Sequence, residues 1–224
     1  MERALIFAAG RGMRMRPLTD ATPKPLLRAG GKRLIEWHLE NLARAGVREV
    51  VINTAHLAEQ FPAALGDGSR WGLRIHYSYE GPEPLETGGG MLHALPLFGV
   101  EPFIAVNGDI FTDFDFSTLP QNLQGLAHLV LVDNPPQHPH GDFALRDGRV
   151  FDEPQLTFAG IGVYRPELLE GQAPGKFGIV PILRAAMRTG NVTGEHCRGV
   201  WNDIGTPQRL ADLDARLRGK AHSL

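Results

Sequence analysis

The 224-residue sequence lacks the features that mark several classes of protein. Its single cysteine, Cys197, cannot form an internal disulfide, which agrees with a reducing compartment. The longest apolar stretches, such as residues 4–9 and 129–132, fall far short of the roughly 18 residues that predict a membrane span. A formal net charge of −2 gives no overall basic field to attract DNA or an acidic membrane. We therefore expect no nucleic-acid partner and no membrane association.

The N-terminus carries no export signal either. Residues 1–7 contain no long apolar segment and no small-residue cleavage site, so a cytoplasmic location is expected. Among the histidines, only His138 and His140 have a spacing that suits a metal, and they lie in a proline-rich turn where solvated side chains are expected. There is no internal repeat and no linker long enough to divide the chain. We expect a single domain over residues 1–224.

Short aliphatic runs alternate with segments of helical period along the chain. The runs predict strands at residues 4–9, 49–53, 73–79, 103–107 and 126–132. Helices are expected at residues 33–45, 56–65, 89–95, 180–188 and 207–218, and Gly46 is expected to end the first of them. This alternation favours a mostly parallel sheet with helices on both faces. Turn signals between residues 140 and 165 predict a small antiparallel insertion.

The loop after the first expected strand contains two closely spaced glycines. Without a Cβ, Gly10 and Gly12 let backbone N–H groups approach phosphate oxygens. The dinucleotide fingerprint G-x-G-x-x-G fails, because Met15 occupies its third glycine position, and no P-loop motif occurs. The loop therefore favours a nucleotide that is bound by neither of those two motifs.

Cations cluster in the same loop. Against one acid, Asp20, it carries Arg11, Arg14, Arg16 and Lys24. The two prolines that flank Lys24 restrict its backbone, whereas a lysine in a flexible loop would sample many conformations. A glycine turn with several cations suits a triphosphate.

A second segment, residues 80–90, combines acids with three successive glycines. Glycines at a helix start cost roughly 1 kcal/mol each relative to alanine, so a flat base or a sugar packed against bare backbone would explain Gly88, Gly89 and Gly90. Glu80 and Glu83 are able to accept hydrogen bonds from the ring N–H of a base. Uracil and guanine both carry that donor, so the acids do not decide the base.

Two aspartates are candidate metal ligands. Asp109 follows the strand expected at residues 103–107, at the carboxyl end where open α/β sheets bind ligands. Asp203 lies in a short strand expected before the last helix. Two carboxylates suit Mg²⁺, which takes its remaining oxygens from water and substrate phosphates. Taken singly, each aspartate is more typical of a turn or a helix cap, and spacing alone does not bring the two together.

The run from Leu5 to Leu27 resembles the signature of the sugar-1-phosphate nucleotidyltransferases, L-A-A-G-x-G-x-R-x-x-P-L-T-x-x-x-P-K-P-L, with Phe7 in place of the leucine. Residues 84–89 resemble the family's P-L-G-T-A-G element, and residues 107–109 resemble its metal-binding G-D. Residues 159–161 match its A-G-I element, and residues 201–206 match W-x-D-I/V-G-T. The resemblance covers essentially the whole chain.

The resemblance implies a Rossmann-like three-layer α/β sandwich with a mixed, mostly parallel central sheet. It also implies an enzyme in which a sugar 1-phosphate attacks the α-phosphorus of a nucleoside triphosphate and pyrophosphate leaves. Arg14, Lys24 and Asp109 would then be catalytic, with Arg14 on the β and γ oxygens and Lys24 between the two reacting phosphates. Mg²⁺ would be the cofactor, held by Asp109 and Asp203.

Two sets of substrate-binding residues follow from the same resemblance. The nucleotide side would comprise Ala9, Gly10, Arg11, Gly12, Met13, Lys24, Glu80, Glu83 and Gly88. The sugar side would comprise Asp142, Asp152, Glu153 and Gly160. Many relatives have Glu-Lys-Pro where this chain has Asp152-Glu153-Pro154, so the cation that meets the sugar phosphate is missing or supplied elsewhere.

Within the family, the Glu-Thr-Gly-Gly-Gly element and the turn at residues 141–143 are most similar to members that transfer a uridylyl group from UTP to N-acetylmuramate 1-phosphate in peptidoglycan recycling. His138, His140 and Arg146 flank that turn and are candidates to meet the lactyl carboxylate of this sugar. Guanylyl transfer to mannose 1-phosphate, and uridylyl or thymidylyl transfer to glucose 1-phosphate, remain alternatives.

A Rossmann-type dinucleotide-binding oxidoreductase is a more distant alternative. It requires an acid about twenty residues past the glycine loop, and Glu36, inside the first expected helix, is the only nearby candidate. Larger relatives append a hexapeptide-repeat β-helix, and no such repeat occurs here. We therefore expect a monomer with small-molecule substrates.

Overall fold

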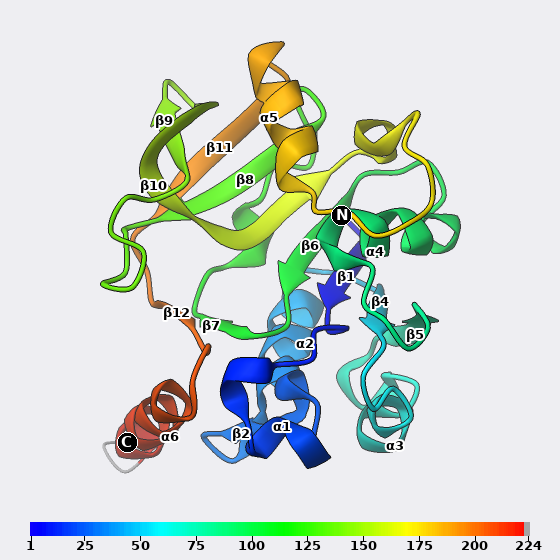
Figure 1. Ribbon diagram of the computed structural model, residues 1–224, viewed down its shortest axis with the longest axis vertical. Helices are drawn as coiled ribbons and strands as arrows, with labels where there is room; N and C mark the ends of the chain where they lie inside the picture. The colour runs from blue at the N-terminus through cyan, green and yellow to red at the C-terminus, as the bar shows by residue number, and fades with distance from the viewer. Residues whose placement is uncertain (222–224) are drawn as a thin grey trace.

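An eight-stranded mixed sheet forms the centre of the molecule (Figure 1). The computed structural model describes residues 1–221. The strands of the sheet are β1 (Arg3–Phe7), β4 (Glu49–Thr54), β5 (Arg74–Tyr79), β6 (Phe103–Asn107), β8 (Ala127–Val132), β9 (Phe143–Arg146), β10 (Arg149–Tyr164) and β11 (Val192–Cys197). Their order is β11-β8-β10-β6-β1-β4-β5, with β9 paired to β10. Strand β10 runs antiparallel to β6, β8 and β9, whereas β1, β4, β5 and β6 are parallel. The expected mixed, mostly parallel sheet is confirmed.

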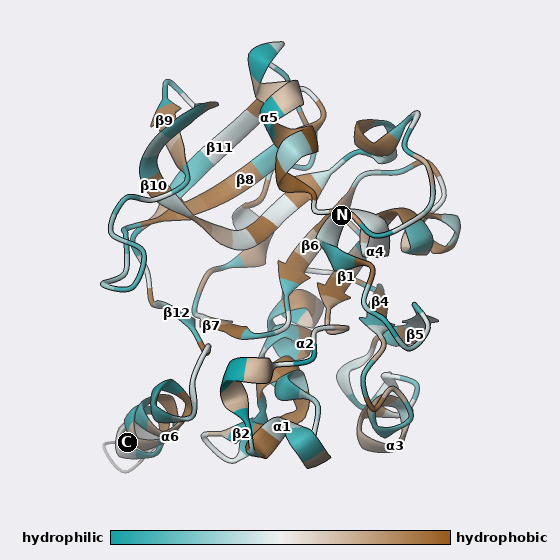
Figure 2. Cartoon of the chain, in the orientation of Figure 1, coloured by the Kyte–Doolittle hydropathy of each residue, from teal (hydrophilic) through white to brown (hydrophobic). Residues whose placement is uncertain are grey.

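Helices cover both faces of this sheet. One face packs against α2 (Leu34–Arg44) and α3 (Gln60–Leu65), and the other against α4 (Glu86–Ala94) and α5 (Val180–Arg188). Successive strand residues point to opposite faces, so Ile6 belongs to the core under α2 while its neighbour Leu5 belongs to the core under α4. Figure 2 shows the central strands as the most hydrophobic part of the chain. Within residues 1–221, no helix is long and apolar enough to cross a membrane.

Two short ladders form separate two-stranded sheets beside the central one. Strand β7 (Ile110–Thr112) pairs antiparallel with β12 (Trp201–Asp203), and β2 (Arg28–Ala29) pairs with β3 (Lys32–Arg33). The short helix α1 (Leu18–Ala21) lies in the loop after β1. Helix α6 (Pro207–Ala221) packs Leu210 and Leu213 into a small core with Met15 and Ile204. The β7–β12 ladder therefore joins the end of the chain to the strand that follows Asp109.

The expected elements are present, with shifted bounds at several ends. The strand at residues 103–107 and the helix at residues 180–188 have the predicted bounds, and Gly46 follows α2 with φ +87°. Helix α3 begins at Gln60 instead of residue 56, because Leu57 has a positive φ of +52° that a helix does not accept. The segment expected as a small insertion is antiparallel, and its long strand β10 lies inside the central sheet.

Candidate active site

A cavity of about 430 Å³ opens at the carboxyl ends of the parallel strands. Strand β1 continues into it with Ala8, β4 contributes Asn53, and β6 contributes Asn107. Ligands of open α/β sheets bind at this edge. The full lining is Phe7, Ala8, Ala9, Gly10, Gly12, Met13, Arg14, Met15, Lys24, Pro25, Asn53, Glu80, Pro84, Glu86, Thr87, Asn107, Asp109 and Gly205.

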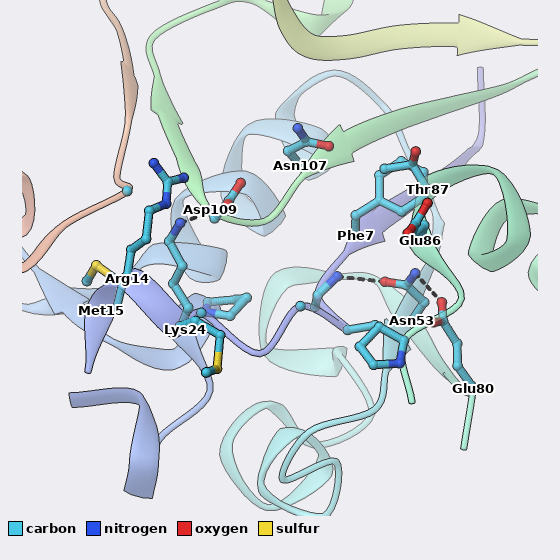
Figure 3. A pocket seen from close by; sticks show the side chains of 18 residues that line it. Phe7, Arg14, Met15, Lys24, Asn53, Glu80, Glu86, Thr87, Asn107 and Asp109 are labelled. Carbon is cyan, nitrogen blue, oxygen red and sulfur yellow. Dashed lines mark hydrogen bonds and ion pairs between the residues drawn. The ribbon is translucent and has the colours of Figure 1, made fainter. Parts of the chain in front are cut away.

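One end of the cavity is cationic. Lys24 donates a hydrogen bond from Nζ to Asp109 Oδ2 at 2.8 Å, and the Lys24 side chain is only 7% exposed, against 40% for Asp109. Arg14 lines the same end (Figure 3). A nearly buried ammonium needs a charged partner, which Asp109 supplies while one of its oxygens stays at the cavity. The pair therefore keeps a nearly buried cation at this end of the cavity.

Gly12 fixes the loop that carries these cations. Its φ is +61°, and a Cβ at this position would lie 2.9 Å from Thr19 Cγ2. The Gly12 carbonyl oxygen accepts hydrogen bonds from Thr19 Oγ1 at 2.9 Å and from Met15 N at 2.8 Å. Gly10 differs, because nothing lies within 4 Å of the place its Cβ would take. The backbone at Gly10 is open to a ligand.

The opposite end of the cavity is built on a chain of short hydrogen bonds (Figure 3). Ala8 N donates to Asn53 Oδ1 at 2.6 Å, and Asn53 Nδ2 donates to Glu80 Oε1 at 2.6 Å. Glu80 Oε2 accepts from Leu85 N at 2.7 Å. Burial raises the pKa of Glu80, against the opposing effect of these hydrogen bonds. Glu80 thus ties the end of β5 to the ends of β1 and β4.

The three glycines of α4 make room for protein atoms. A Cβ on Gly88 would collide with the Phe177 ring, and one on Gly89 with the carbonyl oxygen of Gly175. A Cβ on Gly90 would collide with the Glu80 carboxylate. The expectation that a base or a sugar fills these places is therefore wrong, because the chain fills them itself. Gly88 is buried and does not line the cavity.

The two candidate metal ligands meet through the β7–β12 ladder. Asp203 pairs with Ile110 in register, and Ile204 N donates to the Asp109 carbonyl oxygen at 3.0 Å. Both side chains line a second cavity of about 230 Å³. Asp203 Oδ2 accepts from Arg209 Nη1 at 2.8 Å, so each carboxylate has one oxygen held by a cation. Among residues 1–221, no cluster of three or more potential ligands occurs. Two carboxylates are nonetheless what Mg²⁺ needs beside substrate phosphates.

The second cavity shares Asn107 and Asp109 with the first. Gly160 borders Asn107, since a Cβ on Gly160, whose φ is +72°, would collide with the Asn107 amide. Asp142 holds the neighbouring turn, with Oδ1 3.0 Å from His138 Nε2 and Oδ2 accepting from Phe158 N at 2.8 Å. The cavity is lined by Asn107, Asp109, Ile110, Pro135, Gln137, His138, Thr157, Phe158, Ala159, Trp201 and Asp203.

None of the four expected sugar-side residues, Asp142, Asp152, Glu153 and Gly160, lines either cavity. Asp152 forms an exposed ion pair with Arg184 at 3.0 Å, and Glu153 pairs with Arg146. His138 lines the second cavity, whereas Arg146 and His140 do not. Their roles in substrate binding stay predictions.

On the nucleotide side, most of the expected residues line the first cavity. They are Ala9, Gly10, Gly12, Met13, Lys24 and Glu80. Arg11 and Glu83 instead pair with each other at the surface. Asn53, Glu86, Thr87 and Asn107 line the cavity and were missed by sequence reasoning. The position of Asn53 and Asn107 at the ends of apolar strands was the available signal.

The oxidoreductase alternative has no support in this geometry. Glu36 lies in α2, where Oε2 accepts from Arg33 N at 2.6 Å and Oε1 pairs with Arg70 Nη2 at 2.7 Å. It caps a helix, and it does not stand at the end of a strand where a ribose would be held.

Comparison with known proteins identifies the family of this chain. The nucleotidyl transferase family model matches residues 3–145. The chain belongs to the nucleotidyl transferase family. A Neisseria meningitidis serogroup B nucleotidyl transferase, N-acetylmuramate alpha-1-phosphate uridylyltransferase, is 50% identical to it, over 95% of this chain and 97% of that protein. The Caulobacter vibrioides protein of the same name is 33% identical, over 96% of each.

Solved structures confirm the fold of this nucleotidyl transferase. A Bacillus anthracis protein superimposes with a TM-score of 0.85 at 21% identity, covering 96% of this chain and 95% of that one. The inositol-1-phosphate CTP transferase from T. maritima gives a TM-score of 0.79 at 17% identity, with coverage of 97% and 96%. At these identities the likeness shows the fold alone, and it confirms the expected Rossmann-like sandwich.

Proposed function

We propose that this nucleotidyl transferase moves the uridylyl group of UTP to N-acetylmuramate 1-phosphate and releases pyrophosphate. The observation that carries the proposal is the 50% identity, over nearly the full length of both chains, to a protein named for that reaction. We further propose that the protein is a cytoplasmic monomer with one domain. Its reaction is then a step of peptidoglycan recycling.

The polarity of the first cavity supports one orientation of the nucleotide. Arg14 and Lys24 stand at one end, and the Asn53 and Glu80 network stands at the other. The triphosphate of UTP belongs at the cationic end, because cations and open backbone at Gly10 suit its charge. Its base then lies toward Glu80 and Thr87.

The acceptor belongs in the second cavity, where Asn107 and Asp109 border both spaces. A phosphate oxygen of the sugar 1-phosphate attacks the α-phosphorus, a new P–O bond forms, and the bond to pyrophosphate breaks on the opposite side. Two anions must approach each other in this step. Lys24, fixed by Asp109, offsets their repulsion, and Arg14 neutralises charge on the leaving pyrophosphate.

Asp109 and Asp203 fit a Mg²⁺ ion, since Asp109 immediately precedes β7, Asp203 ends the paired strand β12, and both residues line the same cavity. When bound, the ion would neutralise charge on the α-phosphate and the leaving group. Arg209 and Lys24 hold one oxygen of each carboxylate, so both side chains are oriented by the protein itself. Positioning and charge neutralisation are the main contributions of the chain to this reaction.

The test is a matrix of four nucleoside triphosphates against several sugar 1-phosphates, measured as pyrophosphate release. With UTP we expect a higher kcat/KM for N-acetylmuramate 1-phosphate than for N-acetylglucosamine 1-phosphate, which lacks only the lactyl ether. A charge-assisted contact to the lactyl carboxylate contributes roughly 1.5–3 kcal/mol, or about tenfold or more in this ratio. A ratio near one, or a preference for GTP with mannose 1-phosphate, would reject the substrates and leave the reaction class intact.

A further inference from the structure

Glu86, the first residue of α4, has a backbone conformation that side chains rarely adopt. Its φ is +62°, in the left-handed region, where a Cβ is crowded by the following carbonyl. Only Leu57 and Asp147 share a positive φ among the non-glycine residues that the structure describes. Of these three, Glu86 is the one that lines the first cavity. Strained residues that persist at a cavity are a reason to look for function.

Hydrogen bonds on its neighbours hold the Glu86 backbone in place, since Leu85 O accepts from Phe177 N at 3.1 Å and Thr87 Oγ1 accepts from Ile179 N at 3.0 Å, but no side-chain contact in the described part of the chain compensates for this conformation. Across residues 1–221, the Glu86 carboxylate has one charged neighbour, Lys176, with Nζ 3.9 Å from Oε1. Both side chains are more than half exposed, so the pair is weak. The bare backbone of Gly178 lies beside the second oxygen, since a Cβ there would stand 3.7 Å from Glu86 Oε2. The carboxylate is left able to accept hydrogen bonds.

The other acids near this end of the cavity are already engaged. Both oxygens of Glu80 accept hydrogen bonds from the protein, one from Asn53 Nδ2 and the other from Leu85 N. Glu83 pairs with Arg11 at the surface and does not line the cavity. Among the acids of residues 80–86, Glu86 therefore combines access to the cavity with a carboxylate that no hydrogen bond holds (Figure 3).

We infer that Glu86 is a specificity residue that accepts a hydrogen bond from the ring N3–H of the uracil base. The inference rests on the proposed function, which puts the base at this end. Uracil presents N3–H as a donor, whereas cytosine presents a lone pair at N3, which a carboxylate repels. Glycine would adopt this left-handed backbone freely, so an acid at this position of the cavity wall makes the backbone conformation less favourable.

N3-methyl-UTP is the direct probe, because it keeps the triphosphate and the ring but lacks the N3–H donor. The ratio of kcat/KM for UTP to that for N3-methyl-UTP is measured for wild type and for Glu86→Gly, with the same sugar 1-phosphate. We expect the variant to lower this ratio at least about tenfold, the size of one charge-assisted hydrogen bond. Glu86→Gln keeps an acceptor without the charge, so its ratio should lie between the two.

Asp147→Gly is the matched control. Asp147 is also an exposed acid with a positive φ, +49°, but it lies in the turn between β9 and β10 and lines neither cavity. Because glycine adopts positive φ freely, the Tm of neither glycine variant should fall. Only Glu86→Gly should change the UTP to N3-methyl-UTP ratio.

Two results would count against the inference and are distinguishable. If wild type uses UTP but Glu86→Gly keeps the wild-type ratio, Glu86 does not recognise N3–H, and the proposed function stands. If wild type does not accept UTP, the proposed function fails and the inference fails with it.

Discussion

At the scale of single residues, the two proposed metal ligands differ in the ion pairs that they form. Asp109 is the charged partner of the nearly buried Lys24, whereas Asp203 pairs with Arg209, whose side chain is 29% exposed. We expect Asp109→Asn and Asp203→Asn each to lower turnover by several orders of magnitude, because an amide keeps the shape but loses the charge that would hold Mg²⁺.

The same two variants should differ in their free energy of unfolding. Asp109→Asn leaves the Lys24 ammonium without a charged partner, at a cost of about 1–3 kcal/mol in unfolding free energy. Asp203→Asn should cost less, since water reaches Arg209. Turnover at limiting Mg²⁺ and thermal unfolding are the two measurements. Near-full turnover in either variant would refute its assignment as a metal ligand.

His38 should make stability fall in mild acid. It is buried in α2 with Nε2 2.9 Å from the Ile110 carbonyl oxygen, and burial lowers its pKa from 6.5 to about 4. The unfolded chain therefore binds a proton more readily than the folded one between these values. Stability is complete above pH 6.5 and is lost as pH falls toward 4, by at most about 3 kcal/mol.

Urea unfolding of wild type and His38→Gln at pH 7 and pH 4.5 measures this contribution. The unfolding free energy of wild type should drop more between the two pH values than that of His38→Gln, which has no proton to gain. Carboxylates such as Asp115 and Asp214, whose pKa values are lowered by hydrogen bonds, contribute equally to both proteins and cancel in the difference. Equal drops would show that His38 does not govern the acid response.

At the scale of elements, periodicity predicted the strands and helices well where local preference and packing agree. Helix α2 buries Ile35, Leu39 and Leu42 on one face, and this spacing is visible in the sequence. The start of α4 was placed too late, because three glycines disfavour a helix locally. Tertiary packing by Phe177 and Gly175 overrides that preference, and the partners of those contacts are about ninety residues away.

The Gly89→Ala substitution, which adds a single methyl group, tests this packing of α4. A Cβ on Gly89 would collide with the backbone of Gly175, so Gly89→Ala must displace the segment around Phe177 or the helix itself. We expect a loss of about 1–3 kcal/mol in unfolding free energy, typical of overpacking. Gly178→Ala is the control in the same segment, since its Cβ would make only an ordinary contact 3.7 Å from Glu86 Oε2. A stable Gly89→Ala variant would mean that the segment yields easily.

At the scale of the whole molecule, the site joins segments that the sequence keeps far apart. Asp109 and Asp203 meet because β7 and β12 pair, and no local pattern encodes a ladder between strands of three residues. Sequence reasoning brought the two together only through the family resemblance. Asn53 was missed for a related reason, since its bonds to Ala8 and Glu80 exist only once β1, β4 and β5 align.

Because the first cavity is lined by β1, β4, β6, α4 and the loop before α6, a bound nucleotide should stabilise the chain as a whole. A ligand at 100 times its Kd adds about 2.7 kcal/mol if it binds only the folded state. For a chain of this size, that raises Tm by about 5–10 °C. We expect this shift with UTP, and a much smaller one in Lys24→Ala at the same concentration, because the triphosphate loses its buried cation. Thermal unfolding over a UTP titration is the measurement. A shift with GTP but none with UTP would move the base preference to guanine while keeping the cavity as the nucleotide site.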